Sequence, residues 1–216
     1  REAPGRAELV DEVLRVGEVR GALDEAVLVL IEKVSEIDDE DRRKETHRTI
    51  ARVCRDRSID RGLAKRHFTE ILALDPEDMD ALDSLIRLHD EDGEVEALVG
   101  LLARKADLVL EPGPRCDLLL WAGDLYAGKL GQVDQAIGCY TGVLDMDPAC
   151  VRAIEALEAL YEKGEHWLEL VEVLGRKADV VGTPAERIVA LKKKGLIQHE
   201  KLAATLDAVE TFLEVL

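Results

Sequence analysis

The stretch LARKADLV, at residues 102–109, returns 72 residues later as LGRKADVV, at residues 174–181. Laying residues 73–144 over residues 145–216 without a gap gives 22 identical positions in 72, spread along the whole unit. Residues 1–72 overlay in the same register but are more diverged. Self-similarity at a fixed period is the signature of a repeat architecture. The shared letters RKAD are therefore interpreted as the end of a recurring helix and not as a catalytic motif.

The period divides the chain into three expected repeat units, residues 1–72, 73–144 and 145–216, that together form one continuous array. The length of 216 residues is three times 72, so both ends fall at equivalent points of the repeat. Solenoids usually end in polar caps, whereas this sequence stops at the apolar ETFLEVL and starts without Met. We therefore expect an internal fragment of a longer array, flanked by more repeats.

Composition predicts an all-α protein. Aromatic residues make up 3% of the chain and Asn is absent, while Leu, Ala, Val, Glu, Asp and Arg dominate. A hydrophobic content of 47% beside 35% charged residues fits amphipathic helices that share a narrow core. The net charge of −17 disfavours nucleic acid as a partner. No apolar run approaches the roughly 20 residues of a membrane helix, so membrane insertion is not expected.

Four cysteines, Cys54, Cys116, Cys139 and Cys150, show neither CxxC spacing nor His partners at zinc-site intervals. We expect buried free thiols in a reducing compartment, which indicates a cytoplasmic protein.

Within residues 73–144 the apolar spacing is helical. Leu82, Leu85 and Ile86 follow the i, i+3, i+4 pattern, and DEDGE at residues 90–94 breaks it before a second helix. The prolines of residues 111–115 should stop that second helix. A third helix is expected at 118–126, a turn at 127–132 and a fourth helix at 136–144. Each unit is thus two antiparallel hairpins of about 36 residues, and six such hairpins predict an α-solenoid.

The second hairpin of each unit resembles the tetratricopeptide repeat. Its first small residue is Ala51, Gly123 or Gly195, its second is Ala64, Ala136 or Ala208, its aromatic is Phe68, Tyr140 or Phe212, and its closing proline is Pro76 or Pro148. A small side chain lets two helices cross closely, and the aromatic then fills the wedge towards the next hairpin. The first hairpins are degenerate copies, with Ala26, Leu98 and Leu170 at the small position and Leu30, Leu102 and Leu174 at the aromatic one. A HEAT-type pair fits the length less well.

The resemblance implies a right-handed superhelix whose concave face, lined by the first helix of each hairpin, binds a protein or peptide. Counted from Ala51, the expected groove positions on the first such helix are Arg48, Arg52 and Arg55, which share one helix face. The expected positions on later first helices are Asp80, Asp83, Arg87, Asp117, Asp124, Arg152 and Glu155. The groove would carry both signs of charge.

The arginines belong to a basic block at residues 42–66, in which ten Lys and Arg against three Asp and Glu give +7 in a chain of −17. Two interpretations stay open. The block neutralises the acidic helix beside it, or it anchors an acidic segment of a partner. The carboxylate clamp of some family members needs Asn, which this chain lacks.

A search for catalytic and metal-binding motifs identifies no catalytic residue, cofactor site or metal site. QHEKLA at residues 198–203 starts like a HExxH zinc motif but has Ala203 in place of the second His. Five histidines, His47, His67, His89, His166 and His199, are expected apart, at the surface or groove edge. Trp121 and Trp167 are expected to pack between hairpins.

These features predict a non-enzymatic interaction scaffold. The alternative hypothesis is the peptide-sensing arm of a signalling protein, such as a kinase or a transcription regulator. An appended effector domain would distinguish the two.

Overall fold

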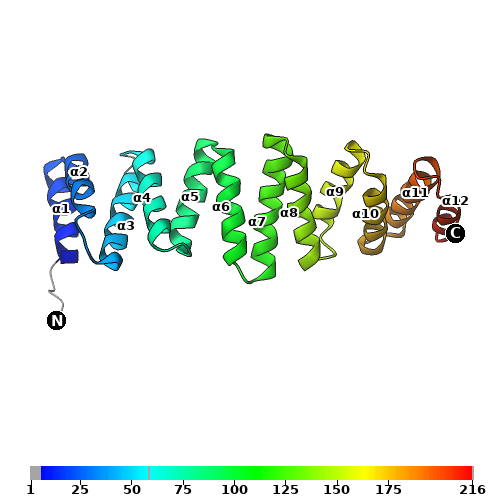
Figure 1. The fold of residues 1–216 in the computed structure, drawn as a ribbon, viewed down its shortest axis with the longest axis horizontal. Coiled ribbons are helices and arrows are strands. Elements are labelled where there is room, and N and C mark those ends of the chain that lie inside the picture. The colour runs from blue at the N-terminus through cyan, green and yellow to red at the C-terminus, as the bar shows by residue number, and fades with distance from the viewer. Residues whose placement is uncertain (1–5, 58, 216) are drawn as a thin grey trace. The chain divides into compact units, whose positions relative to one another are not determined.

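The computed structural model describes residues 6–57 and 59–215, and every regular element within them is helical. In chain order the elements are α1 (Arg6–Arg20), α2 (Leu23–Val34), α3 (Glu40–Asp56), α4 (Arg61–Leu74), α5 (Met79–Asp92), α6 (Val95–Leu108), α7 (Pro112–Leu125), the π-helical η1 (Tyr126–Leu130), α8 (Val133–Met146), α9 (Val151–Lys163), α10 (Trp167–Val180), α11 (Pro184–Glu200) and α12 (Thr205–Leu213). The all-α prediction is confirmed (Figure 1).

Helix starts recur at the spacing of the sequence repeat. Helices α3, α7 and α11 begin at residues 40, 112 and 184, each 72 after the last, and α4, α8 and α12 begin at 61, 133 and 205. The sequence period is therefore also the period of the secondary structure.

Local chemistry accounts for several helix ends. Asp78 caps α5 by accepting a hydrogen bond from the Ala81 backbone N–H at 3.0 Å, and Thr183 starts α11 with a capping box. Helix α5 ends at Asp92, and the next residue, Gly93, has a φ of 70°, the left-handed conformation that glycine adopts most easily. The same conformation recurs one period later at Glu165, with φ 57°, so the backbone shape persists where the glycine is lost.

Two local predictions for the second sequence repeat, residues 73–144, are wrong. The expected helix at 118–126 begins instead at Pro112, because proline at the first helical position lacks only an N–H that has no partner in the helix. The expected turn at 127–132 is also mostly helical, since η1 continues α7 to Leu130 and Gly131 then closes it with φ 65°.

The chain divides into two compact units, Arg1–Leu101 (unit 1) and Leu102–Leu216 (unit 2). In unit 1 each helix from α1 to α5 packs on the next along the chain. In unit 2 the same holds from α7 to α12. Neighbouring helices within each unit form the hairpin series of an α-solenoid, as predicted (Figure 1).

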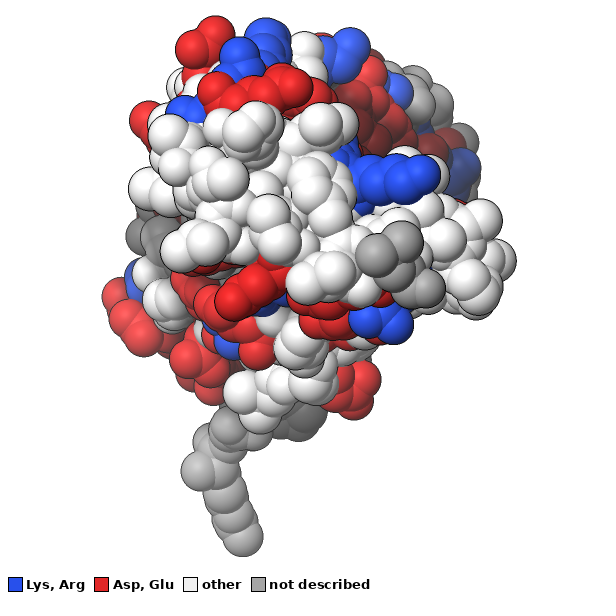
Figure 2. Space-filling model, turned by 90° about the vertical axis from the view of Figure 1, so that its right-hand side faces the viewer, with Lys and Arg blue, Asp and Glu red and all other residues white. Residues whose placement is uncertain are grey.

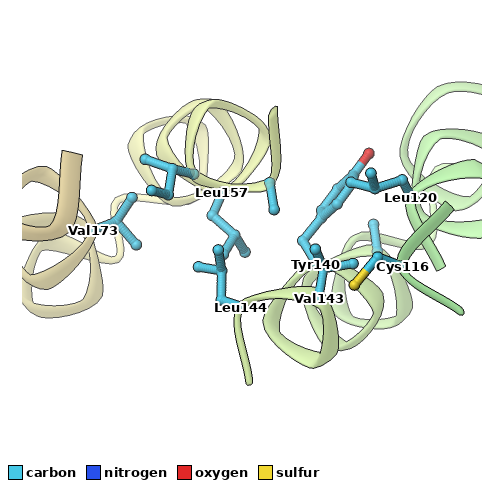
Figure 3. Close-up of a cluster of buried hydrophobic side chains, with 10 residues drawn as sticks. Cys116, Leu120, Tyr140, Val143, Leu144, Leu157 and Val173 are labelled. Atoms are coloured by element: carbon cyan, nitrogen blue, oxygen red, sulfur yellow. The ribbon is translucent and has the colours of Figure 1, made fainter. Parts of the chain in front are cut away.

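Small residues and aromatics meet inside the second hairpins. A Cβ atom added to Gly123 on α7 would lie 2.7 Å from Cε1 of Tyr140 on α8, and one added to Gly195 on α11 would lie 2.7 Å from Cε1 of Phe212 on α12. The aromatic ring therefore sits directly on the glycine of its own hairpin. Figure 3 shows Tyr140 in this core with residues from α7, α8, α9 and α10, including Leu157.

Two of the four thiols, Cys54 and Cys116, are buried as expected, whereas Cys139 and Cys150 are partly exposed. Within the described residues, no helix combines the length and the apolar character needed to cross a bilayer.

Candidate functional site

Helix α3 presents the three predicted arginines on one side. Asp39 caps its start by accepting from the Arg42 backbone N–H at 2.9 Å, and the helix runs unbroken through Arg48, Arg52 and Arg55. The side chain of Arg52 is 47% exposed, whereas those of Arg48 and Arg55 are only 18% and 20% exposed. Of the three, Arg52 is the one most accessible to a partner.

The acidic start of α5 holds two of these arginines. Arg48 pairs with Asp78, and its Nε lies 3.7 Å from Oδ2 of Asp80. Nη2 of Arg52 lies 2.7 Å from the same Asp80 oxygen. The predicted groove residues Arg48, Arg52 and Asp80 thus form one ion-pair network between successive first helices.

Arg55 is held by three different contacts. Its Nη1 donates to Oγ of Ser84 on α5 at 2.9 Å, and its Nε lies 2.7 Å from Oδ1 of Asp56. Its guanidinium also stands 5.6 Å above the ring of Phe68, a cation–π contact. The hydrogen bond from Arg55 lowers the pKa of the Asp56 carboxyl.

Other members of the basic block also reach acidic residues on neighbouring helices or directly beside their ends. These pairs are Lys44 with Asp75, Arg57 with Glu18, Arg61 with Glu91 and Asp92, and Lys65 with Asp92 and Glu94. Charge compensation inside unit 1, the first of the two interpretations, accounts for these contacts. A carboxylate of a partner would compete with them.

The other predicted positions on α5 and α7 lie at the surface. Asp83, Arg87 and Asp117 are exposed. Nε of Arg87 lies 3.9 Å from Oε1 of Glu91, a distance at which an exposed pair contributes little to stability.

In unit 2 the predicted residues Asp124 and Arg152 form an ion pair between α7 and α9. Asp124 also accepts a hydrogen bond from the Tyr140 hydroxyl at 2.7 Å. Burial, together with this hydrogen bond, raises the pKa of Tyr140. Positions 124 and 152 are equivalent to 52 and 80, because 52 + 72 = 124 and 80 + 72 = 152. The same bridge between successive first helices is therefore built twice, with its charges exchanged.

A hollow of about 420 Å³ lies between α9, α10 and α11 in unit 2. The predicted residue Glu155 lines it. Its apolar wall is made by Val151, Leu174, Val180, Val181, Ala185, Val189 and Ala190. Val151 is 41% exposed and Val189 is 66% exposed, so aliphatic side chains stand open to solvent at its edge.

A compact charge cluster forms one side of the hollow. Glu158 on α9 accepts from Nζ of Lys177 on α10 at 2.8 Å and from Nζ of Lys193 on α11 at 2.7 Å. Lys193 also contacts Glu162 at 2.9 Å. Burial raises the pKa of Glu158, but the two lysine hydrogen bonds outweigh it, and the net pKa is lowered. The cluster joins the three helices that surround the hollow, whose other lining residues are mostly aliphatic.

The sequence prediction missed most of this cluster. Lys177 is the lysine of the second RKAD sequence, whose pattern predicted only the end of a helix. Glu158 and Lys193 stand where the preceding sequence repeat, residues 73–144, has Ile86 and Trp121, because 158 − 72 = 86 and 193 − 72 = 121. A charged pair that replaces apolar residues at two repeat positions is a signal that could have been found from the sequence.

The expectation that the histidines lie apart at the surface is wrong for two of them. His47 on α3 and His67 on α4 are both buried, with their Nδ1 atoms 2.8 Å apart, so one ring donates to the other. Burial lowers the pKa of His47 and lowers that of His67 to about 4. Their separation of 20 residues hides this contact, which only the packing of α3 on α4 creates.

No protein-family model matches the sequence, and no curated protein matches it. Several solved tetratricopeptide-type structures align with the chain. YrrB, described as a TPR protein with an unusual peptide-binding site, is 13% identical over 86% of this chain and 91% of its own, with a TM-score of 0.46. MamA from Desulfovibrio magneticus is 20% identical over 80% of this chain and 92% of its own, with a TM-score of 0.42. PilF from Pseudomonas aeruginosa is 19% identical over 98% of this chain and 92% of its own, also with a TM-score of 0.42. Because all three TM-scores lie below 0.5, the resemblance to the tetratricopeptide repeat rests only on the residues of the second hairpins.

Proposed function

We propose that this chain is a non-enzymatic scaffold that binds a peptide segment of a partner protein along the first helices of its hairpins. The observation that carries the proposal is the hollow between α9, α10 and α11, where an apolar wall is open to solvent beside fixed charges. Binding pockets are commonly concave and apolar, of about 300–1,000 Å³, with a few polar groups that fix orientation. In this proposal an aliphatic side chain of the peptide occupies the hollow.

The charges beside the hollow would orient the peptide. Lys177 and Lys193 share Glu158, so both ammonium groups are held in place without becoming free surface charges. A carbonyl oxygen of the peptide backbone can accept from an ammonium group that has donors to spare. The hollow would then select for an aliphatic side chain, and the lysines would set the direction of the chain that carries it.

The arginine face of unit 1 is proposed as a second contact, for an acidic segment of the partner. Arg52 supports this role because half of its side chain is exposed and its partner Asp80 is shared with Arg48.

The cysteines of this chain are free thiols, and burial raises the pKa of Cys54 to about 11. Free thiols of this kind fit a protein of the cytoplasm.

A peptide library selected on the intact chain tests the hollow. We expect the selected peptides to share an aliphatic residue and to bind the Val151→Asp/Val189→Asp variant at least about tenfold more weakly, because a charge then lines the apolar wall. The matched control is Leu168→Asp, which alters a residue on α10 that is also 66% exposed but does not line the hollow. Equal affinity for the wild-type chain and the double variant would disprove the proposal.

The contribution of the arginine face needs a variant that keeps its ion pair. Arg52→Asp combined with Asp80→Arg reproduces the charge order seen at Asp124 and Arg152, so folding should be retained. Acidic peptides that use Arg52 should lose affinity for this variant, and their binding should weaken as salt is raised. Unchanged binding would assign the arginines to charge compensation alone.

A further inference from the structure

The hollow lies where the third sequence repeat, residues 145–216, departs from the two before it. Val189 stands where those repeats have Asp117 and Glu45, because 189 − 72 = 117 and 117 − 72 = 45. Glu158 stands where the second repeat has the buried Ile86. An apolar side chain thus replaces charged ones at the edge of the hollow, and a carboxylate replaces a core residue beside it. A buried ion pair is often no more stable than the apolar residues it replaces, so this exchange points to binding and not to stability.

The valines at the edge are exposed because of their place in the repeat. Val189 is 66% exposed, and its equivalents Asp117 and Glu45 are also exposed, although further first helices follow both of them. Met79, the equivalent of Val151, is 38% exposed, close to the 41% of Val151. The openness of the hollow is therefore a property of these repeat positions and not of the place of α11 near the last helix.

The three carboxylates that line the hollow are held to different degrees. Glu158 is 15% exposed and holds two ammonium groups, with that of Lys177 at 2.8 Å. Glu186 accepts from the hydroxyl of Thr183 at 2.7 Å, in the capping box of α11. Glu155 is 58% exposed, and Nζ of Lys177 lies 3.4 Å from its Oε1. Because Lys177 already has the closer Glu158, the carboxylate of Glu155 can turn to another cation.

The balance of charge around the hollow favours a cation as that group. Three glutamates and two lysines line the hollow, and both lysines are paired. The chain as a whole carries a net charge of −17. Figure 2, which looks at the side where α11 and α12 lie in Figure 1, shows Asp and Glu side chains gathered above and below an uncharged area. Such a field attracts a basic segment of another protein and repels a second copy of this chain.

Val151 and Glu155 are spaced so that one short extended segment can contact both. They lie one turn apart on α9, about 6 Å along the helix axis, and both line the hollow. In an extended peptide, side chains two residues apart point to the same side and are separated by about 6.6 Å. An aliphatic side chain placed against Val151 therefore brings the side chain two residues away to Glu155.

We propose that the partner segment bound in the hollow is basic as well as aliphatic: an arginine or lysine two residues from the aliphatic side chain pairs with Glu155. This rests on the proposed function, since it names the chemistry of the same peptide. A guanidinium suits the site best, because it can pair with both oxygens of one carboxylate. The partner is thus a protein with an exposed, extended segment in which one residue separates an aliphatic from a basic side chain.

A peptide library with one fixed residue tests this pairing. Nonapeptides with leucine at the fifth position and all other positions randomised are selected on the intact chain, on Glu155→Gln and on Glu162→Gln. We expect arginine or lysine to be enriched at the third or the seventh position on the wild-type chain and on Glu162→Gln, and the enrichment to be lost on Glu155→Gln. Glu162→Gln is the matched control, because Glu162 is 53% exposed on the same helix but does not line the hollow.

The outcomes separate this pairing from the proposed function. Selected peptides that bind Val151→Asp/Val189→Asp as well as the wild-type chain would disprove the proposed function, and the pairing with it. Selected peptides that need both valines but carry no basic residue at the third or seventh position, or keep that residue on Glu155→Gln, would overturn the pairing alone.

Exchange of the two charges provides a second measurement. In a selected peptide, changing the basic residue to glutamate should weaken binding to the wild-type chain at least about tenfold, as measured by fluorescence anisotropy. Glu155→Lys should restore the affinity for the changed peptide, whereas Glu162→Lys, which alters the net charge equally, should not. Both variants alter exposed side chains, so the helical circular dichroism of the chain should be unchanged. Equal recovery with both variants would show an effect of net charge alone and would overturn the pairing.

Discussion

At the scale of single residues, the decisive feature is the contact of a glycine with an aromatic ring. Gly123 and Gly195 meet Tyr140 and Phe212 so closely that a Cβ atom would overlap the ring. The sequence predicts a small residue here, because two helices must cross closely. The structure shows that the aromatic ring of the same hairpin also requires the small residue, because the ring lies directly against it. The requirement is steric, so it can be tested with one methyl group.

We predict that Gly123→Ala lowers the free energy of unfolding by about 1–3 kcal/mol, the usual cost of overpacking a core. The added Cβ would lie 2.7 Å from Cε1 and 2.9 Å from Cζ of Tyr140. Gly138→Ala is the control, since nothing lies within 4 Å of its Cβ. It should raise stability by about 0.5–1 kcal/mol through helix propensity. Urea denaturation measures both, and a Gly123→Ala variant as stable as Gly138→Ala would contradict the steric account.

At the scale of elements, helices are joined by polar contacts as well as by the apolar core. The bridge between successive first helices appears as Arg52 with Asp80 in unit 1 and as Asp124 with Arg152 in unit 2. The ion pair therefore keeps its two positions in the repeat, while the positive and the negative residue change places. Inside the hairpin of α3 and α4, the buried contact of His47 with His67 plays a similar joining role.

The histidine contact predicts a pH dependence. Burial lowers the pKa of His67 to about 4 in the folded chain, against 6.5 for the ordinary imidazole. Both states are neutral above pH 6.5, so the contact stabilises fully there. As the pH falls, the unfolded chain takes up the proton first, and stability is lost. From pH 7 to pH 5 His67 should remove about 2 kcal/mol from the free energy of unfolding.

Urea denaturation at pH 7, 6 and 5 measures this loss. His67→Gln is the comparison, because its amide can still pair with His47 but does not titrate. The stability of this variant should depend less on pH over the same range. The same slope in both proteins would show that folding does not lower the pKa of His67.

At the scale of the whole molecule, stability comes from contacts between chain neighbours. Unit 2 has separate core clusters, one around Tyr140 and Leu157, one of Leu170, Leu174 and Ile197, and one of Ala178, Ala190 and Leu191. An array of this kind responds to damage locally, since each hairpin is coupled mainly to the next.

Leu157→Ala tests this locality within unit 2. Leu157 is 2% exposed, and its truncation should cost about 2–5 kcal/mol. Amide hydrogen exchange should accelerate most in α8, α9 and α10, and least in α11, whose Ala190 and Leu191 belong to a different cluster. An equal acceleration throughout unit 2 would instead indicate a single cooperative core.

The sequence by itself determined the repeat, the helical class and the hairpin pattern, because apolar periodicity and small residues act locally and recur every 72 positions. It also predicted that Arg48, Arg52 and Arg55 share one face of the helix now labelled α3. Only the tertiary structure decided which charges meet, as between Arg52 and Asp80, or between Glu158, Lys177 and Lys193. It likewise placed the buried ring of His47 against that of His67. The physical reason is that helix periodicity fixes which residues share a face, whereas ion pairs, burial and exposure depend on which other helix packs against that face.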